Sequence, residues 1–162
     1  MNDARSNLIR ILQNAHAGEL AAAYAYRGHW KSLRESAEKE RIKQIEAEEW
    51  AHRANVRKWL EQLGAKPNAL REKIFWTIGR SLGLTCYVSG WFFPMYFAGR
   101  LESQNVQEYV EAAEFAKELE MQDCAEEMLE MSRTEGEHEI FFSQAVTGHR
   151  LLPLTKTIFK WS

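Results

Sequence analysis

Hydrophobic positions recur at helical spacing along most of the chain, and strand-like alternation is nowhere sustained. Helical periodicity runs over about residues 2–33 and breaks in the polar stretch Lys31 to Ser36. Ser36 can cap a second helix, which is predicted to end at Leu63, before Gly64 and Pro67. Because a short turn joins these two long helices, we expect them to pack antiparallel.

The second half of the chain repeats this plan after an intervening segment. Residues 69–98 are richer in aromatic residues and glycine than the rest, and we interpret them as a helical crossover between two helix pairs. A third helix is predicted from near Pro94 to about Leu119, and a fourth from near Gln122 to about Val146. The pattern predicts an all-α antiparallel four-helix bundle over residues 1–146, followed by an amphipathic tail over residues 147–162.

Composition supports one helical domain and narrows the partners. The 162 residues suffice for one hydrophobic core but not for two, and 45% hydrophobic with 27% charged residues suits long helices. A formal net charge of -2 provides no basic field, so nucleic-acid binding is disfavoured. Cys86 and Cys124 form neither a Cys-x-x-Cys pair nor a disulfide framework, and we expect both to be buried. The first ten residues lack a signal-peptide core, which makes the cytoplasm the default location.

The aromatic crossover raises the question of a membrane. Its uncharged stretch from Ser81 to Ala98 just reaches the length of a transmembrane helix, but Arg80 borders it and two glycines and a proline interrupt it. A membrane span is therefore disfavoured. Four aromatic residues are predicted either to contact the inner face of a membrane as a peripheral surface or only to pack against the bundle: Trp76, Trp91, Phe92 and Phe93.

Two Glu-x-x-His motifs carry the candidate chemistry, Glu49 with His52 and Glu135 with His138. Residues three apart share one face of a helix, so each motif can present a carboxylate and an imidazole to one metal ion. One such motif is weak evidence, because a helix rich in Ala, Glu and Lys produces it by chance. The phase of the motifs relative to the apolar stripes is a stronger test.

Each proposed ligand interrupts a stripe that is otherwise apolar, apart from the thiol of Cys124. On the first helix the stripe consists of Leu8, Leu12, Ala15, Glu19, Ala22 and Tyr26. On the second it consists of Ile42, Ile45, Glu49, His52, Val56, Trp59 and Leu63. On the fourth it consists of Cys124, Met128, Met131, Glu135, His138, Phe142 and Ala145. On the third helix Glu102 shares its stripe with Ala98, Val106, Tyr109 and Ala113, whereas Glu108, Glu111 and Glu114 are predicted to face solvent.

The ligands also lie at matching heights. The midpoint between Glu19 and Glu49 is position 34, inside the first polar turn, and that between Glu102 and Glu135 is 118.5, just before the second turn. Antiparallel helices therefore bring each pair level. Four inward carboxylates would repel one another unless cations or protons compensated them, and two divalent ions neutralise four carboxylates. The alternative is that each residue is a satisfied core polar group or lies on the surface.

This pattern is that of ferritin-like di-iron bundles, in which two helices each give one Glu and two each give a Glu-x-x-His motif. Carboxylate-rich sites with one imidazole per ion suit two iron ions, with manganese as the alternative. Tyr26 is a candidate catalytic residue that would line an oxygen-binding cavity or relay a proton, and ordinary packing is the alternative. His16 is predicted either to support a ligand or to lie at the edge of its stripe, and His29 and His149 are predicted to be exposed.

The chain resembles the demethoxyubiquinone hydroxylase family of ferritin-like monooxygenases. The residues that carry the resemblance are His16-Ala17-Gly18-Glu19, Tyr26, Gly28, Glu49-x-x-His52, Leu101-Glu102-Ser103, Tyr109 and Glu135-x-x-His138. The resemblance implies that Glu19 and His52 hold one iron, that Glu102 and His138 hold the other, and that Glu49 and Glu135 bridge them. It also implies a peripheral membrane enzyme that hydroxylates a quinone ring. In two places the chain departs from the family pattern: Glu139 stands where a second histidine is usual, and Leu-Ala-Ala-Ala follows Glu19.

The leading hypothesis is therefore a di-iron monooxygenase that uses dioxygen to hydroxylate an apolar aromatic substrate, for which a quinone is the candidate. The sequence carries no nicotinamide, flavin or rubredoxin motif, so electrons are expected from an external donor or from the substrate. One alternative is a ferritin-like or rubrerythrin-like iron oxidase or peroxide-scavenging protein. Another is a non-enzymatic, metal-stabilised binding module. A homo-oligomer is compatible with each of these.

Overall fold

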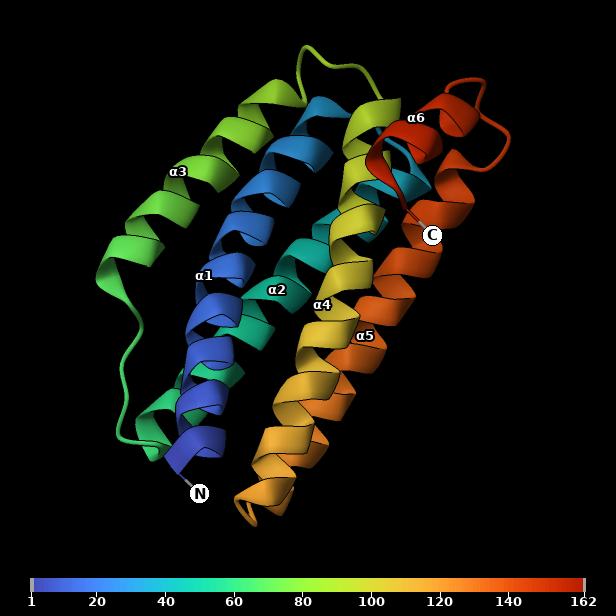
Figure 1. Ribbon diagram of the computed structural model, residues 1–162. Coiled ribbons are helices and arrows are strands. Elements are labelled where there is room, and N and C mark those ends of the chain that lie inside the picture. Colours follow the sequence, from blue (N-terminus) through green and yellow to red (C-terminus); the bar gives the residue numbers. More distant parts are fainter. Residues whose placement is uncertain (1, 162) are drawn as a thin grey trace.

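The computed structural model describes residues 2–161, and in them all regular secondary structure is helical. The helices are α1 (Asn2–Ser32), α2 (Ala37–Gln62), α3 (Ala69–Thr85), α4 (Phe92–Glu118), α5 (Gln122–Val146) and α6 (Leu152–Phe159). The long helices α1, α2, α4 and α5 form the bundle, α3 runs along the outside of α1, and α6 lies across one end (Figure 1). The predicted all-α, ferritin-like bundle is confirmed, and the crossover between its second and third helices is itself a helix.

Local sequence signals fix most helix ends where they were predicted. The Ser36 side chain accepts a hydrogen bond from the backbone N–H of Lys39 at 3.2 Å, which confirms it as the N-cap of α2. Gly64, with a φ of 65°, follows the end of that helix in the left-handed conformation that glycine adopts easily. Helix α4 begins at Phe92, two residues before the predicted start at Pro94. The first N–H groups of a helix have no acceptor within the helix, so a proline, which has no N–H, is tolerated in the first turn.

Helices α1 and α3 approach each other at glycine residues. A Cβ atom added to Gly28 would lie 2.3 Å from the Cα of Gly83, and one added to Gly79 would lie 2.4 Å from the carbonyl oxygen of Ala21. No side chain fits in either place. The glycines of the crossover therefore set the distance between α3 and the bundle, which explains why this segment is rich in them.

Two apolar clusters fill the bundle, one toward each end. One contains Leu8, Leu12, Val56, Leu60, Tyr109, Met128 and their neighbours, and the other contains Tyr26, Ile42, Ile45, Tyr96, Phe142, Trp161 and theirs. Proposed ligands from all four long helices interrupt the apolar stripes between these clusters. The core is thus divided by a polar layer.

The segment after α5 packs on the bundle. Trp161 is 5% exposed, and its ring occupies the space that a side chain at Gly99 would need, since a Cβ atom there would lie 2.3 Å from the indole. Its indole N–H donates to Glu139 Oε1 at 3.1 Å, and Arg100 Nε donates to the carbonyl oxygen of Phe159 at 2.6 Å. The described part of the predicted tail is therefore anchored to α4 and α5.

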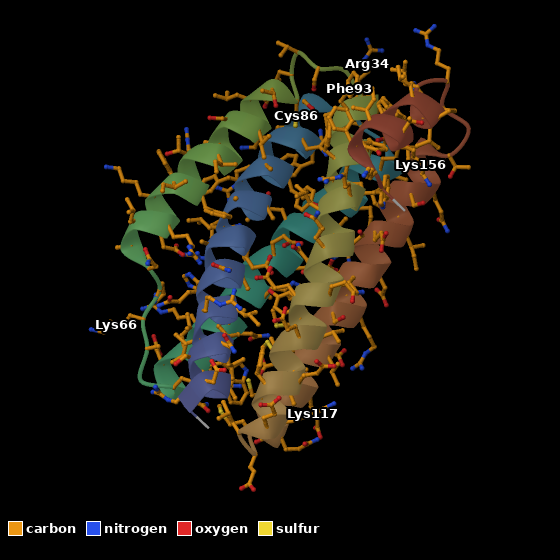
Figure 2. The ribbon with its side chains drawn as sticks, viewed as in Figure 1. Arg34, Lys66, Cys86, Phe93, Lys117 and Lys156 are labelled. Atoms are coloured by element: carbon orange, nitrogen blue, oxygen red, sulfur yellow. The ribbon has the colours of Figure 1, made fainter. Side chains whose placement is uncertain are left out.

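The predicted exposure of four residues was wrong. His29 is buried rather than exposed, and burial lowers its pKa to about 4. Cys86 is half-buried and lies toward the same end of the bundle as Phe93, whereas Lys117 lies toward the other end (Figure 2). Glu108 is half-buried rather than solvated, and burial, followed by the nearby charge of Glu19, raises its pKa to about 7. His149 is half-buried and its ring stacks on Phe92, with centroids 4.1 Å apart.

The substitution Gly28→Ala tests the close approach of α1 and α3. The added methyl group overlaps the backbone of Gly83, so we expect the free energy of unfolding to fall by about 1–3 kcal/mol. The control is Gly18→Ala on the same helix, where the added Cβ would meet nothing within 4 Å and stability should rise by about 0.5–1 kcal/mol. Urea unfolding of the metal-free proteins measures both. Equal stability of the two variants would contradict the close approach of α1 and α3 at Gly28.

Candidate metal centre

Six buried side chains from four helices converge between the two apolar clusters. Their donor atoms form two overlapping groups, and within each group all of them lie within 4.8 Å of one another. One group consists of Glu19, Glu49, His52 and Glu135, and the other of Glu49, Glu102, Glu135 and His138. The structure thus brings together all six residues that the sequence singled out, and it makes Glu49 and Glu135 common to both groups.

Helical phase explains this convergence. Glu19, on α1, and Glu102, on α4, each stand alone on an apolar stripe, whereas α2 and α5 each add an imidazole three residues after a carboxylate. His52 Nδ1 lies 2.9 Å from Glu135 Oε1. His138 Nδ1 lies 3.2 Å from Glu135 Oε2 and 3.3 Å from Glu49 Oε1. Both imidazoles therefore turn Nδ1 toward the shared carboxylates.

The buried carboxylates differ in their affinity for protons. Burial raises the pKa of Glu19, and burial together with the charge of Glu135 raises the pKa values of Glu49 and Glu102 well above the ordinary range. Burial also acts to raise the pKa of Glu135, but hydrogen bonds with His138 and His52 outweigh it and lower that pKa to about 2. Without a cation, at least part of the centre must therefore hold protons.

The imidazoles respond in the opposite sense. Burial acts to lower the pKa of His52 and of His138, but the hydrogen bond of each with Glu135, together with the charges of the neighbouring carboxylates, outweighs burial and raises both pKa values. The metal-free centre thus favours imidazolium beside carboxylate. Metal binding requires these imidazoles to be neutral, so it must release their protons.

The donor set fits a pair of divalent ions. Both carboxylate oxygens of Glu49 and Oε2 of Glu19 are inaccessible to solvent and accept no hydrogen bond from any described residue. Leaving a buried carboxylate unsatisfied costs several kcal/mol in general, which a directly coordinated cation would offset. Two such ions would each have one imidazole, one terminal carboxylate and two shared carboxylates. This combination suits iron or manganese better than zinc or calcium.

Two tyrosine hydroxyls contact the terminal carboxylates. Tyr26 donates to Glu102 Oε1, and Tyr109 donates to Glu19 Oε1. Burial, followed by the charge of the carboxylate that each one touches, raises the pKa of both tyrosines well above its ordinary value. The ring of Tyr26 also stacks on Phe142, with centroids 5.6 Å apart. The hydroxyl of Tyr26 therefore lies at the candidate metal centre, and its ring packs in the adjoining apolar cluster. A catalytic role for Tyr26 stays a prediction.

Sequence reasoning missed the role of Tyr109 and the contact of Glu48. Tyr109 was placed on the inward stripe seven residues after Glu102, and that spacing was the available signal. Glu48 Oε2 lies 2.7 Å from His138 Nε2, on the side of the ring away from the other ligands. The sequence carries no signal for this contact, because it joins residues 90 positions apart and Glu48 lies beside the stripe of α2 rather than on it.

His16 is buried but bonds away from the six donors. Its Nδ1 lies 2.7 Å from Glu72 Oε1 on α3, and Arg53 Nη2 donates to Glu72 Oε2 at 2.7 Å. Burial lowers the pKa of His16. This network ties the crossover helix to the residues next to the candidate ligands Glu19 and His52.

Comparison with known proteins adds a family. The model of the ubiquinone biosynthesis protein COQ7 family matches residues 6–113, which include Glu19, Glu49, His52 and Glu102 and end before Glu135. Two curated proteins named 3-demethoxyubiquinol 3-hydroxylase, from Bordetella parapertussis and Bordetella bronchiseptica, are each 33% identical over 87 residues. That alignment covers 53% of this chain and 38% of each relative. No solved structure matches the chain.

The pKa shifts predict opposite effects of pH on the metal-free and metal-loaded protein. A group with a raised pKa in the folded state stabilises the fold at low pH, and this stabilisation is lost as pH rises through the folded pKa. Glu19, Glu49, Glu102 and the two imidazoles all act in this direction. We therefore expect the melting temperature of the chelated protein to fall as the pH rises above about 6.5, the ordinary pKa of histidine.

Metal binding should reverse this trend, because Mn²⁺ binds the deprotonated ligands. The rise in melting temperature on adding Mn²⁺ should grow with pH over the same range, by about 2–4 °C for each kcal/mol gained. Calorimetry of chelated and Mn²⁺-loaded protein measures it. His29 and Glu108 also contribute to the pH dependence, but they are not among the proposed ligands, so comparing the chelated with the loaded protein cancels their contribution. A metal effect that shrinks as pH rises would contradict the assignment.

Proposed function

Since the chain belongs to the ubiquinone biosynthesis protein COQ7 family, we propose that it is a di-iron monooxygenase that hydroxylates a quinone-type or other apolar aromatic substrate. One observation carries the proposal: six buried donor groups, four of them carboxylates, converge with unsatisfied oxygens at their centre. Such a cluster is costly to a fold that does not use it. The sequence match and the donor set point to the same kind of centre.

In this proposal Glu19 and His52 hold one ion, Glu102 and His138 hold the other, and Glu49 and Glu135 bridge them. The two overlapping donor groups support this division, because the shared members of the groups are the two proposed bridges. Two iron ions fit best, and manganese is the alternative. When bound, the metal supplies the activation of dioxygen, for which protein side chains alone have no chemistry.

The protein's own residues would orient the ligands and hold protons. The hydroxyls of Tyr26 and Tyr109 fix one oxygen of Glu102 and one of Glu19, so each terminal carboxylate has a defined orientation. Tyr26 is the candidate to hold a proton beside the reacting atoms, because its side chain is buried and its hydroxyl donates to Glu102. The apolar clusters on both sides would keep bulk water out, which strengthens every charge interaction in the layer.

The names of the two Bordetella relatives favour a demethoxyubiquinol as the substrate. The hydroxylation would place one atom of dioxygen in the new ring hydroxyl and the other in water, and it would consume two electrons and two protons. The chain would draw these electrons from an external donor or from a reduced substrate. The relatives are matched over only part of their length, so substrate and donor are parts of this proposal.

We further propose that the protein meets its apolar substrate at a membrane surface. Among the described residues, none of the helices combines the length and the apolar character that crossing a membrane requires. Helix α3, however, carries a stripe of exposed apolar side chains at every fourth position: Leu70, Ile74, Ile78 and Leu82. Leu84, Tyr87 and Val88 continue the exposure beyond it, and Val88 is 85% exposed. An unpartnered stripe of this kind suits the headgroup region of a lipid bilayer.

Oxygen consumption by the ferrous protein tests the catalytic proposal. Anaerobic protein reconstituted with Fe²⁺ should bind two ions per chain and, when mixed with dioxygen and a demethoxyubiquinol, should yield the hydroxylated quinone. Glu49→Gln should lower product formation by more than about a hundredfold. Loss of a residue that hydrogen-bonds to a metal ligand typically costs about 10–100-fold, and loss of a ligand itself should cost more. Glu61→Gln is the control, since Glu61 is exposed and pairs with Arg57 on its own helix.

Iron oxidation at the same rate with and without the quinone would instead support an iron oxidase or peroxide-scavenging protein. Absence of oxygen consumption by the two-iron protein would support a metal-stabilised binding module. Fewer than two ions per chain after reconstitution would contradict the di-iron centre itself.

Flotation with vesicles of phosphatidylcholine and phosphatidylglycerol tests membrane contact. The double variant Ile74→Glu, Ile78→Glu should lose roughly tenfold or more in vesicle binding. It places charge where the proposal has exposed apolar side chains entering the bilayer surface. The control adds the same two charges on the exposed side of α4, as Gln104→Glu with Gln107→Glu. Equal binding by both variants would show that charge alone governs it, and an oligomer that dissociates only in the α3 variant would assign the stripe to a second copy of the chain.

A further inference from the structure

We propose that Glu48 is a positioning residue that fixes the imidazole of His138 for metal binding and so makes the two metal positions unequal. This inference rests on the proposed di-iron centre. It concerns a residue outside the six donor groups and outside the motifs of the chain. The contacts of its carboxylate carry it.

The two nitrogens of His138 face different partners. Nδ1 lies 3.2 Å from Glu135 Oε2 and 3.3 Å from Glu49 Oε1, which places it at the centre. Nε2 lies 2.7 Å from Glu48 Oε2, on the opposite side of the ring. A carboxylate on that side accepts a hydrogen from Nε2 and leaves the lone pair of Nδ1 free for a metal. It also raises the basicity of the ring as a ligand.

Glu48 is itself held in place by its own helix. Arg41 Nη1 donates to both oxygens of Glu48, at 3.1 and 3.0 Å, and Gln44 Nε2 donates to Oε1 at 3.0 Å. Positions 41, 44 and 48 share one side of α2, so one helix face builds this support. The guanidinium thus holds this carboxylate where it meets a fully buried imidazole.

His52 lacks a matching support. Its Nδ1 faces Glu135 at 2.9 Å, and the edge of its ring meets Tyr109, with centroids 6.1 Å apart. Within residues 2–161, no carboxylate outside the six donor groups bonds to this imidazole. The position served by His138 therefore has the better oriented and more basic imidazole. We expect this position to bind the tighter of the two ions.

Stepwise titration of the metal-free protein with Co²⁺ tests the inference, because visible absorption reports the coordination of each ion. The wild type should bind two ions with unequal affinity. Glu48→Ala should weaken one of them by roughly 10–100-fold and leave the other within about twofold. Glu48→Gln should lose less than Glu48→Ala, because the amide oxygen still accepts the Nε2 hydrogen but carries no charge.

The control is Glu40→Gln on the same helix, which removes an exposed carboxylate that lies 3.9 Å from Lys43. Melting of each metal-free variant reports folding separately. A second readout is the Nε2 proton of His138 in the Zn²⁺-loaded, ¹⁵N-histidine-labelled protein. It should be protected from exchange in the wild type and in Glu48→Gln, and exchange fast in Glu48→Ala.

The outcomes separate this inference from the proposed function. If the wild type binds two ions and Glu48→Ala binds both unchanged, or weakens both equally, the positioning role is overturned and the metal centre stands. If the wild type binds fewer than two ions, the metal centre itself is overturned. Weakening of one ion together with loss of the protected proton supports the inference.

Discussion

The repulsion among four carboxylates in one buried layer is the constraint on which the rest of the structure depends. Each long helix delivers one carboxylate to that layer, and burial, followed by the charge of neighbouring carboxylates, raises the pKa values of three of them. The fold can hold them only if something positive lies among them, whether a proton, an imidazolium or a metal ion. Because the layer must be level, the turns between paired helices must lie midway between the ligands. The stripes above and below the layer can then be wholly apolar.

The crossover helix is coupled to this layer more closely than its position outside the bundle suggests. Backbone contact between Gly28 and Gly83 sets its distance from α1, and Glu72 binds His16 and Arg53, which lie near the ligands of α1 and α2. The apolar stripe of α3 is thus carried on a rigid element rather than a mobile loop. A contact made at this stripe would therefore fix the orientation of the whole bundle relative to the surface that it meets.

The six residues of the carboxylate layer could be predicted from the sequence, because each is a polar residue at helical spacing on a stripe that is otherwise apolar. Ser36 and the bounds of α5 followed from local capping and turn signals, and these depend only on neighbours in the chain. The exposure of four residues was mispredicted because exposure depends on which segments pack together, and periodicity along one helix does not specify this: His29, Cys86, Glu108 and His149. Glu48 was missed for a related reason, since its partner belongs to another helix and a stripe on α2 does not specify it.

The departure at Glu139 has a structural account. The resembled family usually carries a second histidine after the last ligand, whereas here Glu139 Oε1 accepts a hydrogen bond from the indole of Trp161. Trp161 in turn fills the space beside Gly99, one turn before Glu102. Position 139 therefore serves the contact between α5 and the segment after it, not the carboxylate layer. His138 and Glu135 both belong to the donor groups with Glu139 beside them, so the departure leaves the donor set intact.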